Sequence, residues 1–322
     1  MHQPVRFDEA FGARFSVSVD TEEEFDWGGG FCRSSHSLST IAALRGGQRF
    51  FEQSGVVPLY YVDAPVAQRA ETIEALGDAI VAGRCDIGAH LHPWVTPPYV
   101  EATSTYNSFA GNLPAEVEFA KIQHLRDLIR NALGVSAIAY RAGRYGIGVN
   151  TTGLLARAGF RFDSSVRPLF NYRAEGGPDF TYAPIHPYFM DRGRRIVELP
   201  LTSMYVGWAK RLGAHVCHRM PRVLASAAAR TGLVQRISIS PEGYPAALAT
   251  RAIDSAIEMG VRLINISFHS PSLVPGHTPY VRSNSDLDQF YRWFDHIFDH
   301  CARAGIRAAS LSQIDRAVIA EH

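Results

Sequence analysis

Short strand-like runs alternate with helix-like segments along the whole chain, and this alternation constrains the fold more than any other feature. Val56-Val-Pro-Leu-Tyr-Tyr-Val62 is continuously apolar, as expected of a strand that is buried on both faces. Phe15-Ser-Val-Ser-Val-Asp20 instead alternates apolar and polar residues at period two. The strand-like runs cover residues 15–20, 56–62, 86–90, 137–141, 160–163, 196–200, 236–240 and 263–269. The alternation predicts βα units around a parallel sheet.

Two of the helix-like segments carry apolar residues at helical spacing. The first begins at Pro114, where a missing N–H costs least, and ends at Gly134. Its apolar residues are Val117, Leu125, Leu128, Ile129 and Ala132. The second segment carries Leu287, Phe290, Phe294, Ile297 and Cys301. We expect both apolar stripes to face the core.

Residues 95–113 and 167–195 interrupt the alternation and predict long loops, which in compact domains are usually functional or disordered. Their aromatic residues favour ordered loops. No repeat, low-complexity tract or linker divides the chain. A single barrel can have 322 residues, so we predict one domain over residues 1–322, with its core at about 15–313.

Composition excludes several classes of protein. A formal net charge of +1 provides no strong field for nucleic acid or an anionic membrane. No run approaches the roughly 18 uncharged apolar residues of a membrane span, and Met1–Glu9 lacks the apolar stretch of a signal peptide. The four cysteines are far apart without a Cys-x-x-Cys pair, which argues against a zinc finger or redox motif. We therefore expect a cytoplasmic protein with reduced cysteines.

Titratable residues stand at the C-terminal side of most strand-like runs. They are Asp20, His90, Arg141, Asp163 and His269. In a parallel (β/α) barrel the active site lies at this end of the strands. Five strands would thus direct carboxylates, imidazoles and a guanidinium into one cavity.

Two of these motifs suit a metal ion. In Asp20-Thr-Glu22, carboxylates two residues apart can point to the same side of an extended chain, and divalent cations bind such oxygens. Taken alone, the segment also fits a solvated acidic loop. In Gly88-Ala-His90-Leu-His92-Pro93, two imidazoles at the mouth of a strand suit zinc or a similar metal. A single histidine is more often structural, and a His-x-His pair is only moderately specific.

The remaining motifs suit charge stabilisation and proton transfer. In Arg141-Ala-Gly143-Arg144-Tyr145-Gly the glycines allow the backbone to approach a ligand closely. Surface charge is the alternative reading for its arginines, and it suits Arg141 less because Arg141 ends an apolar strand. Asp163 and His269 end buried runs and must be hydrogen-bonded or functional. A histidine can donate a proton to a leaving amine near neutral pH.

The motifs of Asp20, His90, Arg141, Asp163 and His269 follow one another along the chain in this order. The set and its order resemble the NodB-homology polysaccharide deacetylases, carbohydrate esterase family 4. The motif sequences are most similar to those of the WalW-type branch, which is associated with surface-polysaccharide gene clusters. These sequences are Gly-Ala-His-Leu-His-Pro-Trp, Arg-Ala-Gly-Arg-Tyr-Gly, Asp-Ser-Ser-Val and Phe-His-Ser-Pro-Ser-Leu. The resemblance covers about residues 15–313. It implies an α/β fold, an irregular (β/α)7-type barrel. The implied activity is metal-dependent hydrolysis of N-acetyl groups, or alternatively O-acetyl groups, on a carbohydrate by a metal-activated water.

The resemblance also implies a role for each candidate residue. Asp20 would be the general base and His269 the general acid, with Arg141 and Asp163 orienting and tuning the base and Tyr145 close to the oxyanion. Glu22, His90 and His92 would hold a divalent metal, with zinc the first choice and cobalt, nickel or iron as alternatives. The chain departs from the family where Glu22 follows Asp20 in place of an aspartate. It departs again where Trp94 occupies the usual place of the second histidine, which leaves His92 as the substitute.

Two other functions fit the same sequence. A metal-poor amide hydrolase of the same superfamily would act on a small cyclic or linear amide. A carbohydrate-binding pseudoenzyme would stack sugar rings on the loop aromatics, but it would need neither a base nor an acid. We expect a carbohydrate partner, such as a nucleotide- or lipid-linked N-acetyl sugar, and no nucleic acid. The sequence does not indicate an oligomeric state.

Overall fold

The computed structural model describes residues 3–25, 29–34, 36–211 and 222–319. Its central feature is a curved sheet in which seven strands run parallel, in the order β9-β7-β6-β5-β4-β3-β12. The strands are β3 (Arg14–Thr21), β4 (Leu59–Val62), β5 (Asp86–Leu91), β6 (Ala139–Ala142), β7 (Phe162–Asp163), β9 (Val197–Glu198) and β12 (Leu263–His269). The predicted (β/α)7-type arrangement of parallel strands is confirmed.

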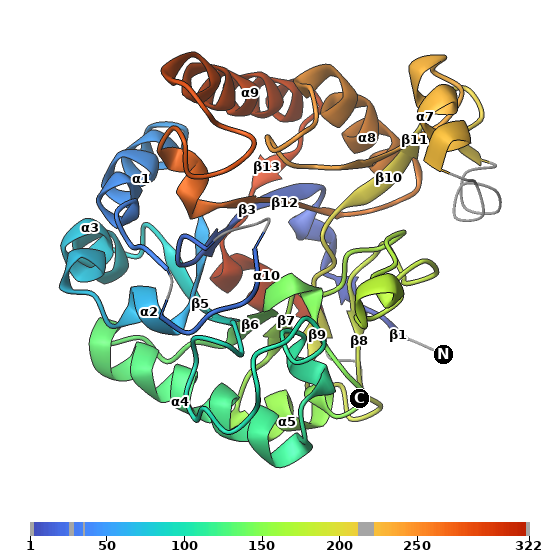
Figure 1. The fold of residues 1–322 in the computed structure, drawn as a ribbon. Helices are drawn as coiled ribbons and strands as arrows, with labels where there is room; N and C mark the ends of the chain where they lie inside the picture. The colour runs from blue at the N-terminus through green and yellow to red at the C-terminus, as the bar shows by residue number, and fades with distance from the viewer. Residues whose placement is uncertain (1–2, 26–28, 35, 212–221, 320–322) are drawn as a thin grey trace.

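Helices surround these strands on the outside (Figure 1). They are α1 (Leu44–Gln53), α2 (Ala64–Ala67), α3 (Ala70–Val81), α4 (Ala115–Leu133), α5 (Thr151–Ala158), α8 (Ala246–Glu258) and α9 (Asn284–Arg303). The predicted ends of α4 are confirmed, with Pro114 at its N-cap and Gly134 in the left-handed conformation at its C-cap. The predicted core stripe is right for Leu125 and Ile129 but wrong for Ala132, which is exposed because Leu133 faces inwards in its place.

The run 236–240 was predicted as one more strand of the parallel sheet, and this is wrong. Strand β11 (Gln235–Ser238) pairs antiparallel with β10 (Ser203–Val206) in a separate two-stranded sheet. The physical reason is its polar face: Arg236 is exposed whereas Ile237 is buried. A strand with one wet face suits an antiparallel pair, because parallel strands are covered on both sides.

The barrel closes between β12 and β9 without a regular ladder. Residues 199–202, which follow β9, cross to β12, where the Thr202 N–H donates to the Asn265 carbonyl oxygen at 3.3 Å. The Asn265 side chain donates to the Leu199 carbonyl oxygen and the Ser164 hydroxyl at 3.1 and 3.0 Å. Side-chain hydrogen bonds therefore take the place of backbone pairing here, which makes the barrel irregular.

Short elements complete the described chain. They are β1 (Gln3–Pro4), β2 (Arg6–Phe7), β8 (Tyr188–Phe189), α7 (Arg222–Arg230), β13 (Arg307–Ala308), α10 (Leu311–Ala317) and β14 (Val318–Ile319). The predicted loop 167–195 contains β8, which pairs with β1 and β9. None of the helices in the described ranges is both long and apolar enough to cross a bilayer.

Sheet register brings the predicted site residues together. Asp20 on β3 is directly opposite His269 on β12, and His90 on β5 is directly opposite Arg141 on β6. These positions all lie at the C-terminal ends of their strands. The alternation of side chains along β3 then places Glu22 on the same side as Asp20.

Candidate metal centre and catalytic site

A cavity of about 300 Å³ opens at the C-terminal ends of the strands. Six of the eight predicted site residues line it: Asp20, Glu22, His90, His92, Tyr145 and His269. The other two, Arg141 and Asp163, are fully buried and do not line the cavity. The structure thus gathers six predicted residues at one surface and places two in the barrel interior.

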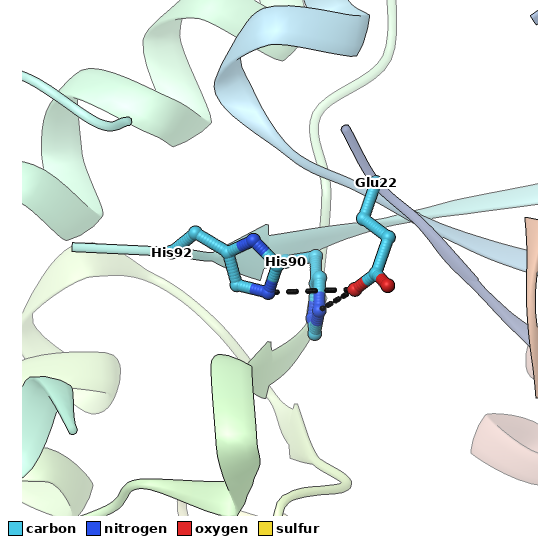
Figure 2. A group of neighbouring side chains, drawn as sticks. All are labelled: Glu22, His90 and His92. Atoms are coloured by element: carbon cyan, nitrogen blue, oxygen red, sulfur yellow. Dashed lines mark ion pairs between the residues drawn. The ribbon is translucent and has the colours of Figure 1, made fainter. Parts of the chain in front are cut away.

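Glu22, His90 and His92 line this cavity. Both imidazole rings point toward the Glu22 carboxyl group (Figure 2). The Nε2 atoms of His90 and His92 each lie 3.4 Å from Glu22 Oε2. All three side chains are buried, and their candidate ligand atoms lie within 4.8 Å of one another. A carboxylate and two imidazoles at this spacing form a donor set typical of zinc.

The protonation of the two imidazoles supports this reading. His90 Nδ1 lies 3.2 Å from the Arg141 carbonyl oxygen, which can only accept a hydrogen bond, so Nδ1 carries the hydrogen and Nε2 the lone pair. His92 Nδ1 lies 2.8 Å from Glu23 Oε2, which fixes the same tautomer. Burial lowers the pKa of His90, and that of His92 to about 4. Two neutral nitrogen lone pairs therefore face the Glu22 carboxyl group.

An ionised Glu22 would face two imidazole lone pairs that cannot donate a hydrogen bond to it. Among the described residues Glu22 Oε1 has no hydrogen-bond partner, and burial raises the Glu22 pKa to about 7. A divalent cation would satisfy the two lone pairs and hold the carboxyl group ionised. Glu23, Asp63 and His92 form a second close group, but there His92 Nδ1 already donates its hydrogen to Glu23. The residues present therefore fit a metal at Glu22, His90 and His92.

Trp94, which occupies the usual family place of the second histidine, supports His92 instead. Its ring stacks on the His92 imidazole with centroids 4.2 Å apart. Its indole N–H donates to Glu23 Oε1 at 2.8 Å, and the Glu23 N–H donates to Asp63 Oδ2 at 2.7 Å. The residues behind His92 thus fix its ring plane and tautomer. Sequence reasoning missed Glu23 and Asp63, although Glu23 directly follows a predicted ligand.

Gly143 makes room for His92. A Cβ atom at position 143 would collide with the His92 ring and would lie 2.8 Å from the Leu91 carbonyl oxygen. The motif glycine was predicted to allow close approach of a ligand. In the structure the close neighbour is the candidate metal ligand itself.

Arg141 anchors the predicted base. Its guanidinium donates through Nη1 to Asp20 Oδ1, through Nη2 to the Ser18 and Ser164 hydroxyls at 3.0 and 2.9 Å, and through Nε to the Ser164 carbonyl oxygen at 2.9 Å. Burial acts to raise the pKa of Asp20, but the charge and hydrogen bond of Arg141, together with His90 and His269, outweigh it and lower the pKa to about 2. Asp20 is therefore ionised near neutral pH.

His269 is held by a residue that sequence reasoning missed. Its Nδ1 lies 2.7 Å from Glu242 Oε2, and its backbone N–H donates to Glu242 Oε1 at 3.0 Å. Its Nε2 faces Asp20 Oδ2 at 3.8 Å. Burial acts to lower the pKa of His269, but the carboxylates of Glu242, Glu22 and Asp20 outweigh it and raise the pKa to about 10. A signal for Glu242 was available, because it follows the strand-like run 236–240 at the same strand end.

Asp163 lies deeper than the other candidates. It accepts a hydrogen bond from the Ser165 hydroxyl, and Ser165 in turn accepts one from the Ala142 N–H at 2.8 Å. Glu198 is its direct neighbour on β9, and burial of the two carboxyl groups raises the pKa of both. Asp163 therefore reaches the cavity only through its neighbours on β6.

Tyr145 lines the cavity from a left-handed backbone conformation with φ of 61°, next to Arg144 with φ of 55°. Non-glycine residues rarely adopt this conformation, and it is often found at functional sites. The strained turn brings the Tyr145 ring to the cavity beside Asp20.

Comparison with known proteins supports the fold but does not identify the reaction. No family model matches the chain, and no curated protein matches it in sequence. The structure superposes on a candidate polysaccharide deacetylase from Mycobacterium smegmatis with a TM-score of 0.53 and 18% identity, covering 98% of this chain and 93% of the other. It also superposes on a 4-alpha-glucanotransferase from Thermococcus litoralis with a TM-score of 0.50 and 12% identity, covering 96% of this chain and 41% of the other.

Identities this low show a shared fold. The two proteins are named for different reactions, so the fold alone does not choose between them. The choice rests on the residues that line the cavity.

Proposed function

We propose that the protein is a metal-dependent hydrolase that removes N-acetyl groups, or alternatively O-acetyl groups, from a carbohydrate or glycan precursor. The observation that carries this proposal is the convergence of two neutral imidazole Nε2 atoms on the Glu22 carboxyl group. Asp20 and His269 line the same cavity. A donor set for a metal, a base and an acid thus share one space, which is what hydrolysis of an amide or ester requires.

Glu22, His90 and His92 would hold the metal, with zinc the first choice because two of the three donors are imidazoles. When bound, a divalent cation would polarise the acetyl carbonyl and lower the pKa of a water molecule. Imidazole donors together with a carboxylate also bind cobalt, nickel or iron, so the metal itself has to be identified by analysis.

The side chains around the candidate metal site would move the protons. Asp20, ionised and held by Arg141, accepts a proton from the attacking water. His269, protonated beside Glu242, donates a proton from Nε2 to the departing amine. The backbone N–H of Tyr145 is our candidate donor to the developing oxyanion. In this proposal Asp163 acts indirectly, by holding β6 through Ser165.

The residue sequences of the motifs support placing the chain in the WalW-type branch, and we propose the cytoplasm as its location. Neither affects the chemistry. The metal-poor amide hydrolase and the binding-only protein are the alternatives that an experiment has to separate.

The test combines elemental analysis of the purified protein with an assay for acetate release from N-acetylated oligosaccharides. We expect about one equivalent of a divalent metal, activity that is lost in chelator and restored by added metal, and a loss of about 10²-fold or more in Asp20→Asn with the metal retained. Metal-free protein with full activity would favour the amide hydrolase. Sugar binding without hydrolysis by the metal-loaded protein would favour the binding protein.

A further inference from the structure

Arg167 is a further cationic side chain of the cavity, besides His269 and Arg144. Arg167 begins the segment after β7 and lines the cavity. Its Nε donates to the Ser238 hydroxyl at 3.1 Å and its Nη1 to the Tyr172 hydroxyl at 3.4 Å. Its guanidinium stacks on the Phe170 ring at 3.8 Å. These contacts fix the plane of the guanidinium and engage only part of its five N–H donors.

Arg167 lacks the carboxylate partner that the other cationic side chains of the cavity have. Arg144 pairs with Glu175, and His269 pairs with Glu242. Among the described residues no carboxylate forms an ion pair with Arg167, and its electrostatic neighbours include the tyrosines Tyr145, Tyr172 and Tyr244 and the cation Arg236. Burial raises the pKa of Tyr145 and Tyr172, so their hydroxyls stay neutral and provide no counter-charge. A permanent positive charge therefore faces the cavity uncompensated.

The position of Arg167 relates this charge to the proposed reaction. The Arg167 guanidinium lies 5.5 Å from the centroid of the Tyr145 ring, and both residues line the same cavity as the predicted base Asp20. A ligand that places an acetyl group at the metal site would therefore extend its neighbouring substituents toward Arg167. Ser238 and Tyr172, which accept hydrogen bonds from Arg167, also line the cavity with their side chains.

We propose that Arg167 binds an oxyanion, a carboxylate or a phosphate, that is carried by the sugar bearing the acetyl group. This inference rests on the proposed function for the placement of the substrate. A guanidinium presents parallel N–H donors that match two oxygens of such a group, and charge-assisted hydrogen bonds of this kind are about twice as strong as neutral ones. Arg167 would thus set a preference for acidic over neutral sugars.

Arg236 provides a matched control. It stacks on the same Phe170 ring at 3.7 Å, but it is exposed, does not line the cavity, and donates to the Leu169 carbonyl oxygen at 2.7 Å. Arg167→Met and Arg236→Met remove the same group from the same aromatic ring. Only the first removes a charge from the cavity.

Calorimetric binding to the metal-loaded protein tests the proposal without any need for turnover. The probes are N-acetylglucosamine 1-phosphate, N-acetylgalactosaminuronic acid and neutral N-acetylglucosamine. We expect wild type to bind one of the acidic sugars at least about 10-fold more tightly than the neutral one, since a lost charge-assisted contact costs at least about that factor. The better acidic probe identifies phosphate or carboxylate as the natural group. Arg167→Met should abolish the preference with neutral-sugar binding unchanged, Arg167→Lys should keep part of it, and Arg236→Met should keep all of it.

Equal binding of acidic and neutral sugars by wild type would overturn the proposal even if the variants do not fold. A preference that persists in Arg167→Met would overturn it as well. The acetate-release assay is separate: an intact acidic preference without hydrolysis would count against the deacetylase and leave the oxyanion site standing.

Discussion

At the scale of single residues, the candidate metal site depends on side chains that are not ligands. His92 is held beside Glu22 by its surroundings, because Trp94 stacks on it, Glu23 fixes its tautomer and Gly143 leaves space for it. Such supporting residues commonly tune metal affinity.

Gly143→Ala should therefore weaken metal binding. The added methyl group would push against the His92 ring and the Leu91 carbonyl oxygen, and His92 would turn away from Glu22. We expect a loss of about 10- to 100-fold in metal affinity, measured by competition with a chromophoric chelator. The control is Gly153→Ala on α5, where a Cβ would meet nothing within 4 Å. Equal affinity in the two variants would show that His92 is not a ligand.

Glu242→Gln should change the pH dependence of the reaction. His269 has to carry a proton to act as an acid, and Glu242 is the main group that raises its pKa to about 10 against the effect of burial. A neutral glutamine removes this effect, so His269 loses its proton at lower pH. The alkaline limb of the kcat/KM profile should move down by about one pH unit or more, so the loss relative to wild type should approach about 10-fold or more above pH 10 and should be small at pH 7.

Ser272→Ala is the control for this change. It removes the hydroxyl that donates to Glu242 Oε1 at 2.6 Å but leaves the carboxylate charge in place. Its alkaline limb should stay close to that of wild type. An unchanged profile in Glu242→Gln would argue that His269 is not the acid.

At the scale of elements, helix α4 holds the loop that carries the metal-supporting residues. Lys121 of α4 is fully buried, and its Nζ donates to the carbonyl oxygens of Pro93, Thr96 and Pro98 at 2.9, 2.6 and 2.7 Å. Glu101 Oε1 lies 3.0 Å from the same nitrogen. One ammonium group thus ties the chain after β5 to the helix that follows it.

Lys121→Met should destabilise the protein, because it leaves three carbonyl groups and a carboxylate without their partner. Breaking a buried pair in this way costs about 3–5 kcal/mol, which urea unfolding would measure. Lys210→Met is the control, since its ion pair with Glu258 at 2.6 Å lies partly in solvent and should cost less than about 1 kcal/mol. Similar stability of the two variants would show that Lys121 does not hold the loop.

The sequence predicted elements well where one physical signal dominated. Continuous apolar runs marked strands of the parallel sheet, and Pro114 and Gly134 marked the ends of α4. Strand ends and the motifs around them identified six of the residues that line the cavity. For the run 236–240 the sequence did not predict the right sheet, because local alternation does not tell which partner a strand pairs with. Glu242 was missed although it follows this run, whereas the position of Arg167 arises only when distant segments meet.

At the scale of the whole molecule, the barrel depends on a buried polar network at its closing edge. Asn265 of β12 accepts from the Ser18 hydroxyl at 3.1 Å and donates to Ser164 and to the Leu199 carbonyl oxygen. Ser18 and Ser164 also accept hydrogen bonds from Arg141. The side chains that close the barrel thus belong to the same network that orients the predicted base.

Asn265→Ala should therefore lower the stability of the whole barrel. It would remove three buried side-chain hydrogen bonds, with the Ser18 hydroxyl, the Ser164 hydroxyl and the Leu199 carbonyl oxygen, where no backbone ladder compensates for them, at a cost of about 2–4 kcal/mol. Urea unfolding should show a lower midpoint with an unchanged slope, because the same surface is exposed on unfolding. Asn150→Ala is the control, since Asn150 is exposed at the start of α5 and makes no side-chain capping hydrogen bond. Its midpoint should stay within about 0.5 kcal/mol of wild type. If Asn265→Ala were equally stable, closure of the barrel would have to come from the apolar packing of its helices.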